Sequence, residues 1–140
     1  MPPHDVFPWE AIDTIRELHP GFPREAYAFV MASLGVAVES LPAERMNDAD
    51  RRHLSGGELL VSVASLARRE FGDLARTVFD EWGLRSNEDV GTIVFQLVEI
   101  GQLKARPQDS IDDFRGGPDL LESLDPARRL RTDPPQPADH

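Results

Sequence analysis

The sequence predicts a mainly α-helical domain, and two observations predict it. Apolar residues recur at spacings of three and four through most of residues 8–101, which is the periodicity of helices that bury one face. Helix-start residues and glycines divide this stretch into segments of ordinary helix length. We therefore predict a compact five-helix domain at residues 7–119, preceded by a flexible leader at 1–6. Residues 120–140 are predicted to be a partly docked, mostly disordered Pro-rich tail.

Prolines open the first two predicted helices. Pro8 suits the first turn of a helix over residues 8–18, because a proline there loses no helical hydrogen bond. Pro23 starts a second helix that runs to Leu41. Gly35, inside that helix, costs about 1 kcal/mol relative to alanine. Two explanations for it stay open, a close helix crossing and a tolerated weak spot.

A polar connection at residues 42–52 precedes the third and fourth predicted helices. Ser55 and Glu58 have the spacing of a capping box, which starts the third helix. A Gly-Asp pair at 72–73 supplies a break and a new cap. The fourth helix then continues to Gly83, which ends it in the left-handed conformation that glycine favours.

The fifth predicted helix, at residues 86–101, is the most informative segment of the chain. Ser86 and Asp89 fit a capped start with negative charge at the positive end of the helix, and Gly101 closes it. The residues between are almost wholly apolar, and the polar ones fall on one narrow stripe. We therefore predict that this helix is the buried centre of the domain, covered by the four helices before it.

The segments after this helix are shorter. Residues 102–107 alternate in polarity and end at a proline, which is consistent with a short β-arm, either an edge strand or an extended segment. Residues 110–114 fit one more capped turn, and the leucines of 120–124 fit a short helix that docks on the domain.

Charge and composition restrict the classes of function. Twenty-five acidic and fifteen basic residues give a net charge of −10, which repels nucleic acid and anionic lipid. The chain has no cysteine, which excludes disulfides and thiolate metal sites. The N-terminal sequence has no signal-peptide pattern, and no apolar run reaches transmembrane length. We expect a cytoplasmic protein that does not attach to membranes.

The histidines and acids do not form a catalytic or metal-binding pattern. The four histidines stand at 4, 19, 53 and 140, too far apart for a zinc site on one helix. Adjacent carboxylates on a helix point about 100 degrees apart, so they do not share a proton or an ion well. We therefore predict no catalytic residue, no metal and no cofactor.

One enzyme hypothesis stays open at low weight. His53, directly before the capping box, is expected to contact a helix start or solvent. A site at His53 and Glu58 would require a pocket that joins the capping-box region to the central helix.

A winged helix-turn-helix domain is the alternative fold and function. Residues 100–103 end a helix in Gly-x-Leu before a short arm, which is typical of that domain. DNA would then be bound through Lys104, Arg106 and Arg115. Residues 87–101 contain no lysine or arginine, although a DNA-reading helix needs such residues. The shape is therefore expected to serve protein contact more readily than DNA binding.

The leading hypothesis is a non-enzymatic acidic interaction module, an adaptor that meets a protein partner with a basic surface. Its candidate partner-binding patch consists of five carboxylates. They are Glu88, Asp89, Asp109, Asp112 and Asp113.

Several segments within residues 9–119 resemble one protein family. The matching segments are 26–30, 53–56, 58–60, 71–75, 82–83, 91–101 and 109–114. In these segments the chain is similar to a small uncharacterised conserved bacterial protein family of about this length, described chiefly from planctomycetes and verrucomicrobia. It departs from the pattern at Gly57 and Val90, where glutamine and phenylalanine are expected. The resemblance implies no activity, cofactor or site residue.

Overall fold

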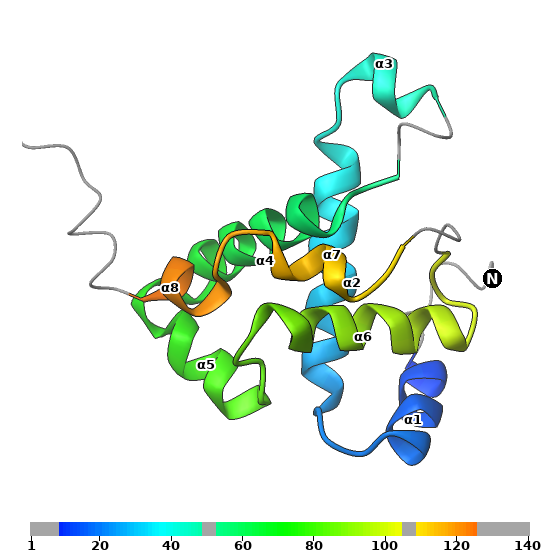
Figure 1. Cartoon of the computed structure of the whole chain (residues 1–140). Coiled ribbons are helices and arrows are strands. Elements are labelled where there is room, and N and C mark those ends of the chain that lie inside the picture. The colour runs from blue at the N-terminus through cyan, green and yellow to red at the C-terminus, as the bar shows by residue number, and fades with distance from the viewer. Residues whose placement is uncertain (1–8, 49–52, 105–108, 126–140) are drawn as a thin grey trace, which may run out of the picture.

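The computed structural model describes residues 9–48, 53–104 and 109–125, and it confirms a mainly helical protein (Figure 1). No strand is present in these ranges. The predicted leader at 1–6 and the tail from residue 126 onward lie outside the described residues. The helices are α1 (Trp9–Leu18), α2 (Arg24–Glu39), α3 (Ala43–Met46), α4 (Gly56–Phe71), the 3₁₀ helix η2 (Gly72–Leu74), α5 (Ala75–Trp82), α6 (Asn87–Glu99), α7 (Asp112–Arg115) and α8 (Leu120–Leu124).

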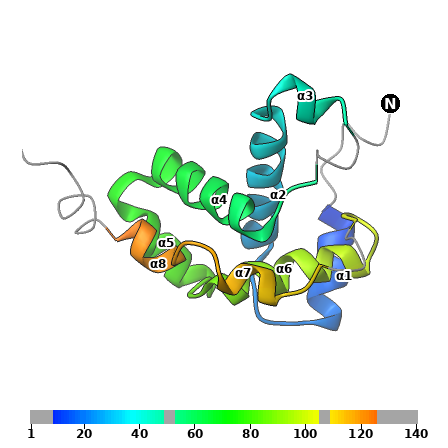
Figure 2. The same ribbon diagram turned by 45° about the horizontal axis from the view of Figure 1, so that its top comes forward.

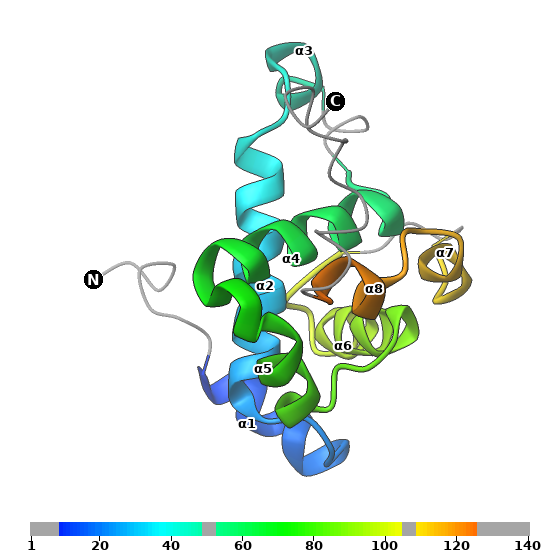
Figure 3. The same ribbon diagram turned by 90° about the vertical axis from the view of Figure 1, so that its left-hand side faces the viewer.

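Two long helices, α4 and α6, pack across α2, as Figures 1 and 2 show. Helix α5 joins the end of α4 to the start of α6, and α1 packs against α2 and α6. The short helices α7 and α8 lie against α4, and α7 also packs on α6 (Figure 3). Helix α3 lies beyond the C-terminal end of α2 (Figures 1 and 3). This arrangement brings α2, α4, α6 and α7 around a common space.

Both predicted capping boxes are confirmed. At the start of α4, the Glu58 amide donates to Ser55 Oγ at 3.0 Å, and the Ser55 amide donates to Glu58 Oε1 at 2.9 Å. At the start of α6, Ser86 and Asp89 make the same reciprocal pair. Gly83 has the predicted left-handed conformation, with φ of +79° at the end of α5. Side chains next to the helix start therefore fix where α4 and α6 begin.

Three connections differ in detail from the sequence predictions. The polar connection at 42–52 contains a helical turn, α3, whose Arg45 guanidinium donates to the Glu58 carboxylate and the His53 carbonyl. The break at 72–73 is a 3₁₀ turn, and α5 begins without the side-chain cap predicted there. The described part of the predicted β-arm, 102–104, is not a strand, and 105–107 lie outside the described residues.

The closed part of the core is rich in aromatic rings. Phe79 and Tyr27 are fully buried. Phe79 meets Phe29 edge-on and Trp82 in a stacked arrangement, with centroids 5.5 and 5.6 Å apart, and Phe71 completes the cluster. These large rings fill the space enclosed by α2, α4 and α5.

One buried hydrogen bond joins α2 to the polar stripe of α6. The Tyr27 hydroxyl donates to Gln96 Oε1 at 2.5 Å. Burial raises the pKa of the Tyr27 phenol to about 12, although nearby Arg16 acts in the opposite direction. The polar stripe of α6 therefore takes part in packing and does not only face water.

Helix α6 is covered on one side and not on the other. Val90, Ile93 and Leu97 are fully buried, whereas Val94 and Phe95 are only half-buried. The helix is therefore buried on one side, as predicted, and only partly covered on the other. Part of its apolar surface faces a space that no side chain fills.

Glycines allow α7 to approach its neighbours closely. A Cβ at Gly91 would lie 2.9 Å from a Phe114 ring carbon, and one at Gly56 would lie 2.9 Å from the Asp113 carbonyl oxygen and 3.3 Å from the same ring. At Gly35, nothing lies within 4 Å of such a Cβ, so the close-crossing explanation for that glycine is wrong. The buried ring of Phe114 thus occupies the space that side chains at Gly56 and Gly91 would need.

Asn87 connects the start of α6 to both C-terminal helices. Its Nδ2 donates to the Phe114 carbonyl at 3.0 Å, and its Oδ1 accepts from the Leu120 amide at 2.8 Å. Leu120 and Leu124 are buried, so α8 packs on its own chain. These contacts hold α7 in place on the far side of the space from α2.

Candidate functional site

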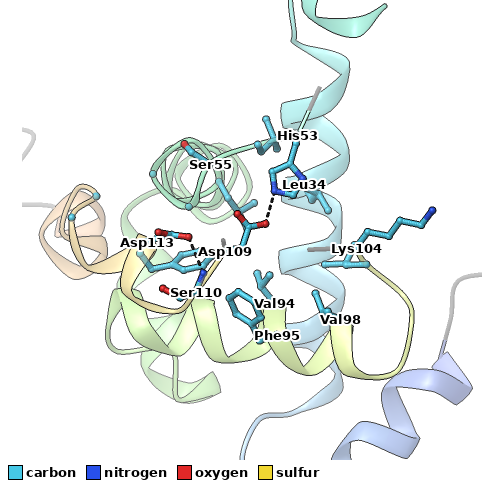
Figure 4. A pocket seen from close by; sticks show the side chains of 18 of the residues that line it. Leu34, His53, Ser55, Val94, Phe95, Val98, Lys104, Asp109, Ser110 and Asp113 are labelled. Atoms are coloured by element: carbon cyan, nitrogen blue, oxygen red, sulfur yellow. Dashed lines mark hydrogen bonds and ion pairs between the residues drawn. The ribbon is translucent and has the colours of Figure 1, made fainter. Parts of the chain in front are cut away.

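A pocket of about 780 Å³ lies between α2, α4, α6 and α7 (Figure 4). It joins the capping-box region to α6, which is the concavity that the sequence analysis required for a site near His53. Its lining consists of apolar side chains, four glycines and a small number of polar groups. The lining residues are Leu34, Val38, His53, Leu54, Ser55, Gly56, Gly57, Leu59, Val94, Phe95, Val98, Leu103, Lys104, Asp109, Ser110, Asp113, Phe114, Gly116 and Gly117.

Most of the apolar lining comes from α2 and α6. Helix α2 contributes Leu34 and Val38, and α6 contributes Val94, Phe95 and Val98. Figure 4 shows the three α6 residues on the side of that helix that faces the pocket. The ring of Phe95 is half-buried, because it packs against the core and also lines the pocket. An apolar surface of this kind favours an apolar group as the occupant.

Four glycines line the pocket where the start of α4 meets the segment after α7. Gly56 and Gly57 begin α4, and Gly116 and Gly117 follow α7. A Cβ at Gly117 would lie 2.8 Å from the Leu60 side chain and 3.3 Å from Gly57 Cα, so the two backbones are in close contact. Residues without side chains bring these segments together but add no volume to fill the space opposite α6.

His53 and Asp109 meet at the edge of the pocket. His53 Nε2 lies 2.8 Å from Asp109 Oδ2, and the two side chains are only 24% and 18% exposed. Figure 4 shows this contact between the segment before α4 and the segment before α7. The sequence predicted His53 to contact a helix start or solvent. That prediction is wrong, because its imidazole faces a carboxylate 56 positions away in the chain.

Further polar groups line the same pocket. Asp113 Oδ2 accepts from the Ser110 amide at 2.9 Å, which fixes the turn that leads into α7. Lys104 lies at the opposite edge, after α6, with its side chain exposed (Figure 4). The pocket lining therefore carries two carboxylates, one ammonium group and one imidazole.

Glu58 does not belong to this pocket. Arg45 Nη1 donates to Glu58 Oε2 at 2.6 Å, and the carboxylate also accepts from the Ser55 amide. The hydrogen bond from Arg45, followed by that from Ser55, lowers the pKa of Glu58 to about 2. The same hydrogen bond raises the pKa of Arg45. Glu58 is therefore held as a structural carboxylate, and the hypothesis of a site at His53 and Glu58 loses one of its two residues.

The five candidate carboxylates separate into three groups. Asp109 and Asp113 line the pocket. Glu88 and Asp112 both bind the Arg115 guanidinium, Glu88 at 3.1 Å. Asp89 accepts from the backbone amides at the start of α6.

The candidate basic residues do not gather on one surface. Lys104 lines the pocket, while Arg115 is held by two carboxylates on the α6 and α7 side. Arg106 lies outside the described residues. Because a guanidinium in two ion pairs has less to offer a phosphate, the structure gives little support to Arg115 as a DNA contact.

Neither a metal-binding cluster nor a membrane-spanning helix is found among the described residues. Within the described ranges, no group of three or more histidine and acidic residues is placed to hold a metal ion. No helix in those ranges has the length and apolar character to cross a bilayer.

His19, directly after α1, lies 3.0 Å from Glu99 Oε1, so a second histidine besides His53 contacts ordered structure.

Comparison with known proteins adds no relative. No protein-family model, no curated protein and no solved structure matches the chain. The resemblance to a bacterial family therefore stays a prediction, and the function is argued from the pocket.

Proposed function

We propose that the protein is a non-enzymatic interaction module that acts in the cytoplasm of a bacterium and binds a basic partner through this pocket. The observation that carries the proposal is the apolar face of α6, which lines an open pocket edged by Asp109 and Asp113. We also propose that the five longer helices form one compact domain, with the pocket as its binding surface.

The chemistry of the pocket favours one kind of occupant. Its volume of about 780 Å³ falls within the ~300–1,000 Å³ typical of ligand sites. The apolar lining binds apolar side chains, and two carboxylates against one ammonium group favour a cationic neighbour. The net charge of −10 supports attraction of a basic partner over distance. We propose an amphipathic segment of another protein, with apolar anchors and at least one arginine or lysine.

A winged-helix regulator of nucleic acid is the alternative, and it has less support. Its helix before the arm has an acidic first turn, and Arg115 is already held by Glu88 and Asp112. If phosphate contacts existed, retention of the protein on DNA would fall steeply with salt concentration. We expect no such dependence.

Selection from a displayed library of random helix-length peptides tests the proposal. The full-length protein is immobilised, and the dissociation constants of selected peptides are measured by fluorescence anisotropy. Val98→Trp places an indole in the pocket, and Leu18→Trp makes a matched change at an exposed position of α1. Circular dichroism checks that both variants fold.

We expect selected peptides that combine apolar residues at helical spacing with arginine or lysine. They should bind the wild type and Leu18→Trp equally and should lose binding to Val98→Trp. Peptides that bind both tryptophan variants equally would overturn the proposal, as would a selection that yields no binder.

A further inference from the structure

We infer that Asp109 is the residue that recognises the cationic side chain of the partner, and that His53 occupies this position until the partner arrives. The inference rests on the proposed function, because it assigns a residue to that binding event. It also goes further, since it predicts that binding breaks a contact within the protein and that His53 competes with the partner.

The first argument is the burial of Asp109. Its carboxylate lies within the pocket lining and is 18% exposed, so much of its hydration is lost. A carboxylate in such a place needs a hydrogen-bond donor or a cation. His53 Nε2, at 2.8 Å from Oδ2, supplies one at the same edge of the pocket (Figure 4). The pair is therefore a satisfied contact that spans the pocket edge.

Second, an arginine of the partner can replace His53 as the hydrogen-bond donor to Asp109. An imidazole offers a carboxylate one N–H from a given ring nitrogen, whereas a guanidinium offers two parallel N–H groups and is always charged. Charge-assisted, bidentate pairs are the stronger ones. An arginine that enters the pocket is thus a better partner for Asp109 than His53 is. The histidine leaves without exposing an unsatisfied carboxylate.

The third argument is the set of charges around the pair. Asp113 lines the same wall as Asp109, and the Lys104 ammonium lies at the other edge of the pocket. The Arg45 guanidinium contacts the His53 carbonyl at 3.4 Å, but it is held by Glu58 outside the pocket. The α7 wall of the pocket is therefore negative, and a cation is attracted to this wall.

The position of the apolar residues completes the description of the partner. Val94 and Phe95 lie across from Asp109 in the same pocket (Figure 4). A segment that buries apolar side chains against α6 brings a neighbouring arginine or lysine to Asp109. The partner class is thus an apolar anchor next to a basic residue.

Two single-charge substitutions test the role of Asp109. Asp109→Asn and Glu81→Gln each remove one negative charge, but Glu81 is exposed on α5, which does not line the pocket. With a peptide selected as above, we expect Asp109→Asn to weaken binding about tenfold, as the loss of a charge-assisted hydrogen bond does. Glu81→Gln should change it less than about twofold.

The change in peptide affinity on removal of His53 distinguishes a competing histidine from one that supports the pocket wall. Because His53 competes for Asp109, His53→Ala should strengthen peptide binding several-fold, whereas a histidine that merely supports the pocket wall would weaken binding when removed. In the wild type, the ¹⁵N chemical shift of the His53 ring should move when the peptide binds. Thermal unfolding of each variant shows that the fold is intact.

The outcomes distinguish this inference from the proposed function. If Val98→Trp abolishes binding but Asp109→Asn behaves like Glu81→Gln, the pocket binds the partner and the role of Asp109 is wrong. Weaker binding by His53→Ala would overturn the role of His53 as a competitor. If peptides bind irrespective of Val98→Trp, the proposed function itself fails.

Discussion

The two sides of α6 carry similar apolar residues, but the surroundings of these residues differ. On one side Val90 and Ile93 are fully buried in the core. On the other side Val94 and Phe95 line the pocket. The core is filled by aromatic rings such as that of Phe79, whereas four of the residues that line the pocket are glycines. The comparison teaches that apolar periodicity marks the residues that avoid water, while the size of the residues facing them decides whether a pocket remains.

Replacing one phenylalanine in the aromatic core and one in the pocket lining tests this comparison most strongly. Phe79→Ala removes a fully buried ring from the aromatic cluster, and the loss in free energy of unfolding should be about 3–5 kcal/mol. Phe95→Ala removes a ring that already borders open space, and the loss should be roughly 1 kcal/mol. Urea denaturation measures both. Equal losses would mean that the pocket side is packed like the core.

Two glycine-to-alanine substitutions sharpen the comparison through opposite signs. At Gly91 a Cβ would lie 2.9 Å from the Phe114 ring, which is also in close contact with Gly56, so the protein should lose about 1–3 kcal/mol. At Gly35 the new methyl group meets nothing, and the protein should gain about 0.5–1 kcal/mol from the better helix former. Thermal melts check both signs. Stabilisation by Gly91→Ala would contradict the close approach of α7.

The burial of Tyr27 against α6 predicts how its phenol titrates. Tyr27 is the single tyrosine of the chain, so tyrosinate absorbance reports it alone. Its midpoint should lie near pH 12 in the folded protein and near about 10 in urea. Because folding raises this pKa, the stabilising contribution is complete below pH ~10 and is lost as the pH rises toward 12. A folded midpoint near 10 would show that water reaches the hydroxyl.

The Glu58 carboxylate, which lies outside the pocket, has a second and smaller pH dependence. Glu58 has a pKa of about 2 in the folded protein, so its contribution is complete above the ordinary carboxyl value and is lost as the pH falls from about 4.5 toward 2. Its side chain is 40% exposed, and after solvent screening the effect should be roughly 1 kcal/mol. Glu58→Gln should flatten this part of the stability curve, and Glu81→Gln is the matched control. An unchanged curve in Glu58→Gln would assign the acid sensitivity to other carboxylates.

The helices were predictable because their signals are local. The Ser55 and Ser86 capping boxes and Gly83 act within a few residues, and each is found where the sequence placed it. Helix α3 was missed because its polar sequence has no apolar period. Its Arg45 is held instead by His53 and Glu58, which follow an intervening stretch of chain.

The candidate site was predictable only in part. His53 was recognised as a residue near a helix start, and Asp109 as a candidate for partner binding, but nothing in the sequence pairs them. Their contact depends on how α7 packs against α4 and α6. The pocket itself depends on the absence of side chains at Gly56 and Gly117, and a sequence pattern reports the glycines without showing what they face.

The Phe114 ring has a consequence for how this binding surface can change. The ring lies where α4, α6 and α7 meet, in contact with Gly56 and Gly91, and it sets the distance between these helices. Because Phe114 also lines the pocket, a thicker or thinner side chain at this position changes both the spacing of the helices and the surface that a bound partner contacts. A substitution at this one position therefore changes the width of the pocket and the size of the partner segment that can enter it.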